Sequence, residues 1–121
     1  MKKDNENLIV KLSLEFALDI ITLVEKLEEL KKYVIARQLL KSGTSIGANI
    51  REAQNAESKA DFIHKMKIAA KEADETEYWL TLCELAPSYP NPEDLKLKLD
   101  SLINIISKII ITSKSRPSSN S

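Results

Sequence analysis

The chain has 121 residues, 43% of them apolar, which is typical of one folded domain rather than of a disordered segment. Its two glycines and four prolines are too few for the many turns of an all-β fold. The 18 basic and 18 acidic side chains balance, so the chain is not a globally basic nucleic-acid binder.

Charge is nevertheless distributed unevenly along the chain. Residues 31–71 contain nine Lys or Arg and three acids, whereas residues 72–100 contain eight acids and two lysines. The two blocks could neutralise each other within the fold, or they could mark surfaces for partners.

Signals for export or membrane insertion are not found. Residues 1–4 lead into mixed charge rather than into the apolar run of a signal peptide. The most apolar stretch, residues 102–111, is interrupted by polar side chains and is too short to span a bilayer. The single cysteine, Cys83, cannot form an internal disulfide, which fits a reducing compartment. We therefore expect a cytoplasmic protein that makes no membrane contact.

An amphipathic helix is predicted for residues 7–30. Apolar side chains recur there at spacings of three and four, which places them on one face of a helix. These side chains are Leu12, Phe16, Ile20, Leu23, Leu27 and Leu30. Leu14, Leu18 and Ile21 extend the apolar surface beyond that face. The excess either packs against another subunit or lies deep within the bundle itself.

A tight turn is placed at residues 31–34, because one continuous helix to residue 53 could not fold back on itself. The second helix then covers residues 34–53. Its apolar face contains Ile35, Leu39, Ile46, Ile50 and Ala53. Gly43 and Gly47 lie within it, although each costs about 1 kcal/mol relative to alanine in a helix interior. They predict either the close approach of another backbone or a local kink or break at Gly47.

The third helix is predicted to begin after Ser58, with Asp61 completing a variant of the capping box. Asn55 is expected to end the preceding helix in the left-handed conformation. The third helix carries a heptad seam and ends before Pro87. The seam contains Phe62, Met66, Ala69, Ala73, Thr76, Leu80 and Cys83.

Asn91 and Pro92, followed by two acids, predict the start of a fourth helix. Its seam contains Leu95, Leu99, Leu102, Ile106 and Ile109. Four helices with short connections predict an all-α fold, an antiparallel up-and-down four-helix bundle over residues 1–113. The Ser-rich residues 114–121 are predicted to form a disordered C-terminal tail.

No constellation of residues predicts catalysis, a cofactor or a bound metal. His64 is the only histidine, and no second histidine or cysteine lies at metal-ligand spacing from it. Cys83 completes an apolar seam, so we expect a buried and inert thiol. The acids of the third helix point in several directions and favour ion pairs over a metal site. They are Glu72, Asp74, Glu75 and Glu77.

Basic side chains on the second and third helices are the candidate nucleic-acid contacts. They are Arg37, Lys41 and Arg51 on the outer face of the second helix and Lys65, Lys67 and Lys71 on the third. Asn49 and Glu52 flank the apolar face of the second helix, and with Gly43 and Gly47 they are the candidate helix-packing residues. Asn49 could set the register of the helices, or it could lie at a subunit junction.

Three segments resemble a known family. Residues 42–53, Ser-Gly-Thr-Ser-Ile-Gly-Ala-Asn-Ile-Arg-Glu-Ala, look like the second-helix signature of the four-helix-bundle proteins encoded in intervening sequences of bacterial 23S rRNA genes. Residues 62–69 and 77–80 resemble the third helix of that family. Many relatives have proline where this chain has Gly47, so a bend there is less compelled.

The resemblance implies an antiparallel four-helix bundle that assembles as a homopentamer with a central channel and has no enzymatic activity. A related accessory protein of diversity-generating retroelements binds a reverse transcriptase and nucleic acid through a basic surface. Our leading hypothesis is therefore a non-enzymatic oligomer that binds RNA, DNA or a nucleic-acid-processing partner through its basic face. The alternative is a protein-interaction scaffold whose charged faces make subunit contacts.

Overall fold

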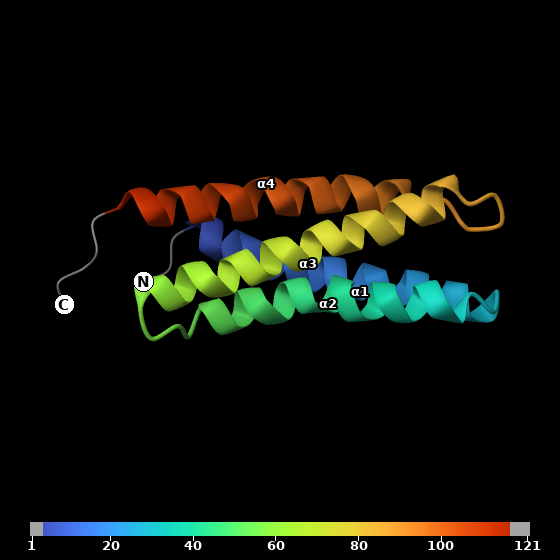
Figure 1. The fold of residues 1–121 in the computed structure, drawn as a ribbon, viewed down its shortest axis with the longest axis horizontal. Coiled ribbons are helices and arrows are strands. Elements are labelled where there is room, and N and C mark those ends of the chain that lie inside the picture. The colour runs from blue at the N-terminus through green and yellow to red at the C-terminus, as the bar shows by residue number, and fades with distance from the viewer. Residues whose placement is uncertain (1–3, 117–121) are drawn as a thin grey trace.

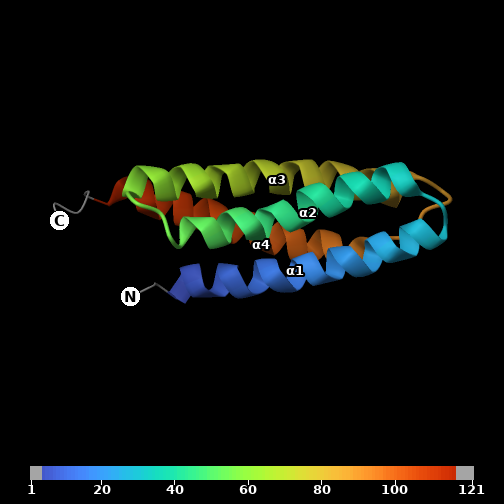
Figure 2. The same cartoon turned by 90° about the horizontal axis from the view of Figure 1, so that it is seen from below.

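The computed structural model describes residues 4–116, with side chains from residue 7 onward, and this part of the chain forms four helices. They are α1 (Asp4–Glu29), α2 (Tyr33–Ala53), α3 (Lys59–Leu85) and α4 (Glu93–Ser115). The helices run alternately up and down and lie side by side along their length (Figures 1 and 2). Each helix packs against two neighbours in the cyclic order α1, α2, α3, α4. The predicted all-α four-helix bundle is confirmed.

The turn between α1 and α2 covers Leu30 to Lys32, so it overlaps the predicted range only at Lys31 and Lys32, and α2 already begins at Tyr33. The Lys32 amide donates to the Leu27 carbonyl at 2.8 Å, and the Lys31 amide donates to the Glu28 carbonyl at 2.9 Å. These two bonds form a Schellman motif, in which Lys31 adopts a left-handed φ of 63°. Glycine usually occupies that position, so no local signal in the sequence marked this turn.

The turn between α2 and α3 differs from prediction at one residue. Asn55 does not take a left-handed conformation, since Lys31 is the only non-glycine residue with positive φ in the described part of the chain. Instead α2 ends at Ala53 and the backbone tightens, with the Asn55 amide donating to the Glu52 carbonyl at 3.0 Å. The Ser58 cap is confirmed, because its hydroxyl accepts from the Asp61 amide at 3.0 Å.

The start of α4 follows the predicted logic with a shift of one residue. The Asn91 side chain accepts from the Glu93 amide at 3.0 Å, so Glu93 rather than Pro92 is the first helical residue. At its other end α4 continues through Ser115, so residues 114 and 115 are helical rather than part of the predicted tail. The remainder of that tail, residues 117–121, lies outside the described residues.

The core lies between the four helices and contains most of the predicted seams. All five seam residues of α4 are buried, as is every seam residue of α3 except the half-buried Phe62. Leu30 departs from the prediction: it is 47% exposed, because it lies in the turn after α1. One polar bridge crosses the core between α2 and α3. There the buried hydroxyls of Thr76 and Ser42 are 2.9 Å apart.

Candidate functional site

The outer face of α2 presents a basic stripe that we define as Arg37, Lys41 and Arg51. All three side chains are exposed, with Thr44 and Ala48 between them on the same face. This placement follows from the helix period, because residues at these spacings return to one side at 100° per residue. None of the three makes an ion pair with an acid whose side chain is described. The stripe therefore presents its three positive charges to solvent.

The three predicted lysines of α3 do not form one surface with that stripe. Lys65 is half-buried between α2 and α3, and its ammonium donates to the Glu52 carboxylate at 3.0 Å. This bond and the Glu52 charge raise the pKa of Lys65. Lys67 and Lys71 are exposed, and at 100° per residue they lie on a different side of α3 from Lys65, which contacts α2. The structure thus separates Lys67 and Lys71 from the basic stripe and pairs Lys65 with Glu52.

Lys114 of α4 is a basic residue that sequence reasoning placed in the tail and left out of the site. Because α4 continues through Ser115, Lys114 lies across from Lys67 on the antiparallel α3, and the nearby Lys67 charge lowers the pKa of Lys114. Predicting this pair requires the register between the antiparallel helices α3 and α4. The register itself was not visible in the sequence.

Gly43 and Gly47 mark the close approach of α2 to α1. A Cβ at Gly43 would lie 2.8 Å from Cγ1 of Ile20, and a Cβ at Gly47 would lie 3.3 Å from the backbone oxygen of Ser13. The helix is continuous through both residues, so the alternative of a break at Gly47 is excluded. Gly47 thus admits the α1 backbone at Ser13, as the close-approach interpretation expects, whereas Gly43 admits the Ile20 side chain.

The polar residues of the same helix have local roles. The Asn49 side chain donates to the Ser45 carbonyl one turn earlier in α2 at 2.8 Å. Glu52 accepts from Lys65, which links α2 to α3 at the surface. The buried polar contact between helices is instead the Ser42–Thr76 bridge, which sequence reasoning did not identify. The sequence feature that could have indicated this bridge is a hydroxyl side chain at a seam position in both the second and the third predicted helix.

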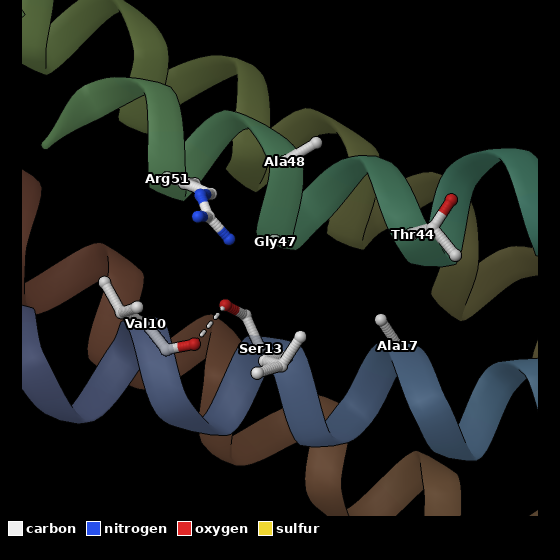
Figure 3. A pocket seen from close by; sticks show the side chains of 8 residues that line it. Val10, Ser13, Ala17, Thr44, Gly47, Ala48 and Arg51 are labelled. Carbon is white, nitrogen blue, oxygen red and sulfur yellow. Dashed lines mark hydrogen bonds between the residues drawn. The ribbon is translucent and has the colours of Figure 1, made fainter. Parts of the chain in front are cut away.

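An apolar groove runs between α1 and α2 beside Gly47 (Figure 3). Its volume is about 230 Å³, and it is lined by Val10, Ser13, Leu14, Ala17, Thr44, Gly47, Ala48 and Arg51. Arg51 extends from α2 toward α1 at one end of the groove (Figure 3). The exposed side chains Leu14, Leu18 and Ile21, 58%, 57% and 39% exposed, continue this apolar surface along α1. The wide apolar face predicted for the first helix is thus at the surface of the bundle.

Among the described side chains, the groups that could carry out chemistry do not lie together. His64 is exposed, and burial raises the pKa of the Cys83 thiol to about 11. Within residues 7–116, no group of three or more His, Cys, Asp or Glu side chains could hold a metal ion. No described helix is long and apolar enough to cross a membrane.

These features define a class of protein: an antiparallel four-helix bundle with a basic outer helix face and an apolar groove between its first two helices. The family described as 23S rRNA-intervening sequence protein matches residues 5–112, and the chain belongs to that family.

A solved structure supports the same assignment. It is the crystal structure of a protein of unknown function from the S23 ribosomal protein family of Bacteroides thetaiotaomicron VPI-5482. That protein is 44% identical to this chain, and the match covers 88% of this chain and 98% of the other with a TM-score of 0.85. No curated protein matches this chain.

Proposed function

We propose that this protein is a non-enzymatic, oligomeric bundle that binds nucleic acid, alone or in a ribonucleoprotein, through a basic face. The observation that carries the proposal is the basic stripe on α2. From Arg37 to Arg51 it extends about 21 Å along the helix at 1.5 Å per residue. Its guanidinium and ammonium groups face solvent without a described acidic partner, and such groups bind phosphates.

The test is fluorescence anisotropy with labelled RNA and DNA oligonucleotides at low and raised salt. We expect binding that weakens with salt, and a large loss of affinity in the variant Arg37→Glu, Lys41→Glu, Arg51→Glu. The matched control is Lys11→Glu, Lys26→Glu, Lys31→Glu, which makes the same charge change at exposed residues of α1 and its turn. No binding by the native protein, or equal losses in both variants, would exclude the basic stripe as the interface.

A second candidate function, a protein-interaction scaffold, is favoured by the groove. Leu14 and Leu18 are large, apolar and more than half exposed, and Arg51 lines the same groove as Leu14. In this alternative the α1–α2 face is a subunit contact in a homo-oligomer. The family resemblance suggests a pentamer, and the basic stripe would meet the acidic residues of a neighbour.

Native mass spectrometry and light scattering distinguish the two candidates. Leu14→Glu with Leu18→Glu should dissociate the oligomer, whereas Leu97→Glu with Ile111→Glu, which alters comparably exposed side chains of α4, should not. If reversal of the basic stripe dissociates the oligomer and leaves the nucleic-acid affinity unchanged, the stripe is a subunit contact. A native protein that is monomeric at micromolar concentration contradicts the oligomer.

A further inference from the structure

The α3–α4 hairpin carries opposite charges in its two halves. In the terminal half, residues 59–71 and 106–116, there are seven Lys or Arg and one acid, Asp61. In the loop half, residues 72–105, there are eight acids and two lysines. The antiparallel arrangement places the start of α3 beside the end of α4 (Figure 1), so the basic residues of both helices meet at one end of the bundle. The separation of positive from negative charge is stronger in the helix pair than in either helix alone.

Two contacts fix the register of this hairpin. At the loop half the Lys96 ammonium donates to the Glu84 carboxylate at 2.8 Å, and at the terminal half the Lys59 ammonium donates to the Arg116 carbonyl. Between these contacts Lys67 lies across from Lys114, and Lys71 follows one turn further along α3. The three side chains are exposed, so a ligand can reach them.

The exposed lysines of the terminal half differ from the lysines of the loop half in their ion pairs. Lys67, Lys71 and Lys114 make no ion pair with an acid whose side chain is described. The hydrogen-bonding proximity of the Lys67 ammonium, together with its charge, lowers the pKa of Lys114. In the loop half, by contrast, Glu84 is paired with Lys96, and Lys98 donates to Asp19 of α1 at 2.6 Å.

The positions of the aromatic side chains indicate whether this surface binds the bases or the phosphates of a nucleic acid. Tyr78 and Trp79 lie in the acidic half, with ring centroids 5.2 Å apart. In the basic half Phe62 packs against the core. His64 is the exposed ring of the described basic half, and the lysine side chains of that half have no planar group that stacks on a base, so phosphates are the groups that these lysines recognise.

We propose that Lys67, Lys71 and Lys114 form a second binding site, which holds the phosphate backbone of a nucleic acid across the end of the α3–α4 hairpin. The inference deepens the proposed function, on which it rests, and adds a site separate from the basic stripe of α2. The acidic loop half repels the same backbone and confines the contact to the end of the bundle where α3 begins. Recognition is independent of base sequence.

The experiment measures oligonucleotide affinity of the full chain carrying Lys67→Glu and Lys114→Glu. We expect the affinity to fall by about tenfold or more at low salt and the salt dependence to become shallower, by about 1.4–1.8 in the logarithmic slope for two lost phosphate contacts. Lys67→Arg with Lys114→Arg should keep the affinity, because the charge is retained. The matched control is Lys11→Glu with Lys26→Glu, and scrambling the oligonucleotide sequence should have no effect.

The outcomes separate this inference from the proposed function. If the native protein binds and only reversal of the basic stripe weakens binding, the α3–α4 site is refuted while the proposed function stands. If the native protein does not bind at low salt, both fail. If Lys67→Glu with Lys114→Glu dissociates the oligomer and restoring the oligomer at high protein concentration restores binding, these lysines meet a second copy, and the inference is overturned. A circular-dichroism melt verifies that each variant is folded.

Discussion

The α1–α2 and α3–α4 hairpins fold in the same way but present different surfaces. The described part of α1–α2, residues 7–53, has seven basic and six acidic side chains without a marked division along the hairpin, and it exposes Leu14, Leu18, Ile21 and Leu40. Residues 59–116 have nine of each charge, divided between opposite halves. Net charge alone hides the asymmetry of the α3–α4 hairpin, since both hairpins are nearly neutral.

The hairpins also differ in how their helices are held together. In α1–α2 the contact depends on two glycines, whose missing side chains admit Ile20 and the Ser13 backbone. In α3–α4 no glycine lies at the contact, and an ion pair joins Lys96 to Glu84 at the surface. We therefore expect substitutions at the α1–α2 contact to change stability, and substitutions on the α3–α4 surface to change binding with little effect on folding.

The largest expected effect is at Gly43. A leucine there must displace Ile20, because even a Cβ would lie 2.8 Å from Cγ1 of that side chain, and overpacking of this kind costs about 1–3 kcal/mol or more. We expect Gly43→Leu to lower the free energy of unfolding by about 3 kcal/mol, measured by urea denaturation at fixed protein concentration.

Gly47→Ala is the matched control for that substitution. Its Cβ would meet the Ser13 oxygen at 3.3 Å, and the gain in helix propensity, about 0.5–1 kcal/mol, offsets the tight contact. We expect a change within about 1 kcal/mol of the native protein. If Gly43→Leu were tolerated equally well, the close packing of α1 on α2 would not be what holds this hairpin together.

The second prediction tests the buried hydrogen bond that connects α2 of one hairpin to α3 of the other. Thr76 of α3 bonds the buried Ser42 hydroxyl of α2 at 2.9 Å and the Glu72 carbonyl at 2.8 Å. Thr76→Val leaves the Ser42 hydroxyl buried without that partner, at a cost of about 1–3 kcal/mol. Adding Ser42→Ala should recover about 1 kcal/mol, because both partners are then apolar. Thermal unfolding of the native protein, the two single variants and the double variant gives the coupling free energy between Ser42 and Thr76. Additive losses of stability would show that the bridge contributes nothing.

Buried residues were predicted most completely where apolar side chains recur with the period of a helix. The seam of α4 was predicted completely, because apolar side chains at spacings of three and four have one physical meaning in a helix. The prediction was less exact at Lys31, where a left-handed lysine replaces the glycine that would have marked the turn. The Lys67–Lys114 pair was out of reach, since it depends on the register between two helices and on the extent of α4.

The smallest expected effect is a loss of stability at high pH that is caused by a residue of α3. Cys83 is the only titratable side chain among the buried residues of the described chain, and burial raises its pKa from 9.0 to about 11. Between these values the unfolded chain ionises the thiol while the folded chain keeps it protonated. The unfolded state therefore binds fewer protons, and stability falls as the pH rises.

The loss should amount to no more than about 2 kcal/mol between pH 9 and pH 11. Lysines titrate in the same range, so the measured quantity is the difference in pH dependence between the native protein and Cys83→Ala. The variant is less stable at every pH because it leaves a cavity, but it should lose the extra alkaline slope. Parallel pH profiles for the two proteins would mean that the thiol is as accessible to water when folded as when unfolded. The seam of α3 would then be open to solvent at Cys83.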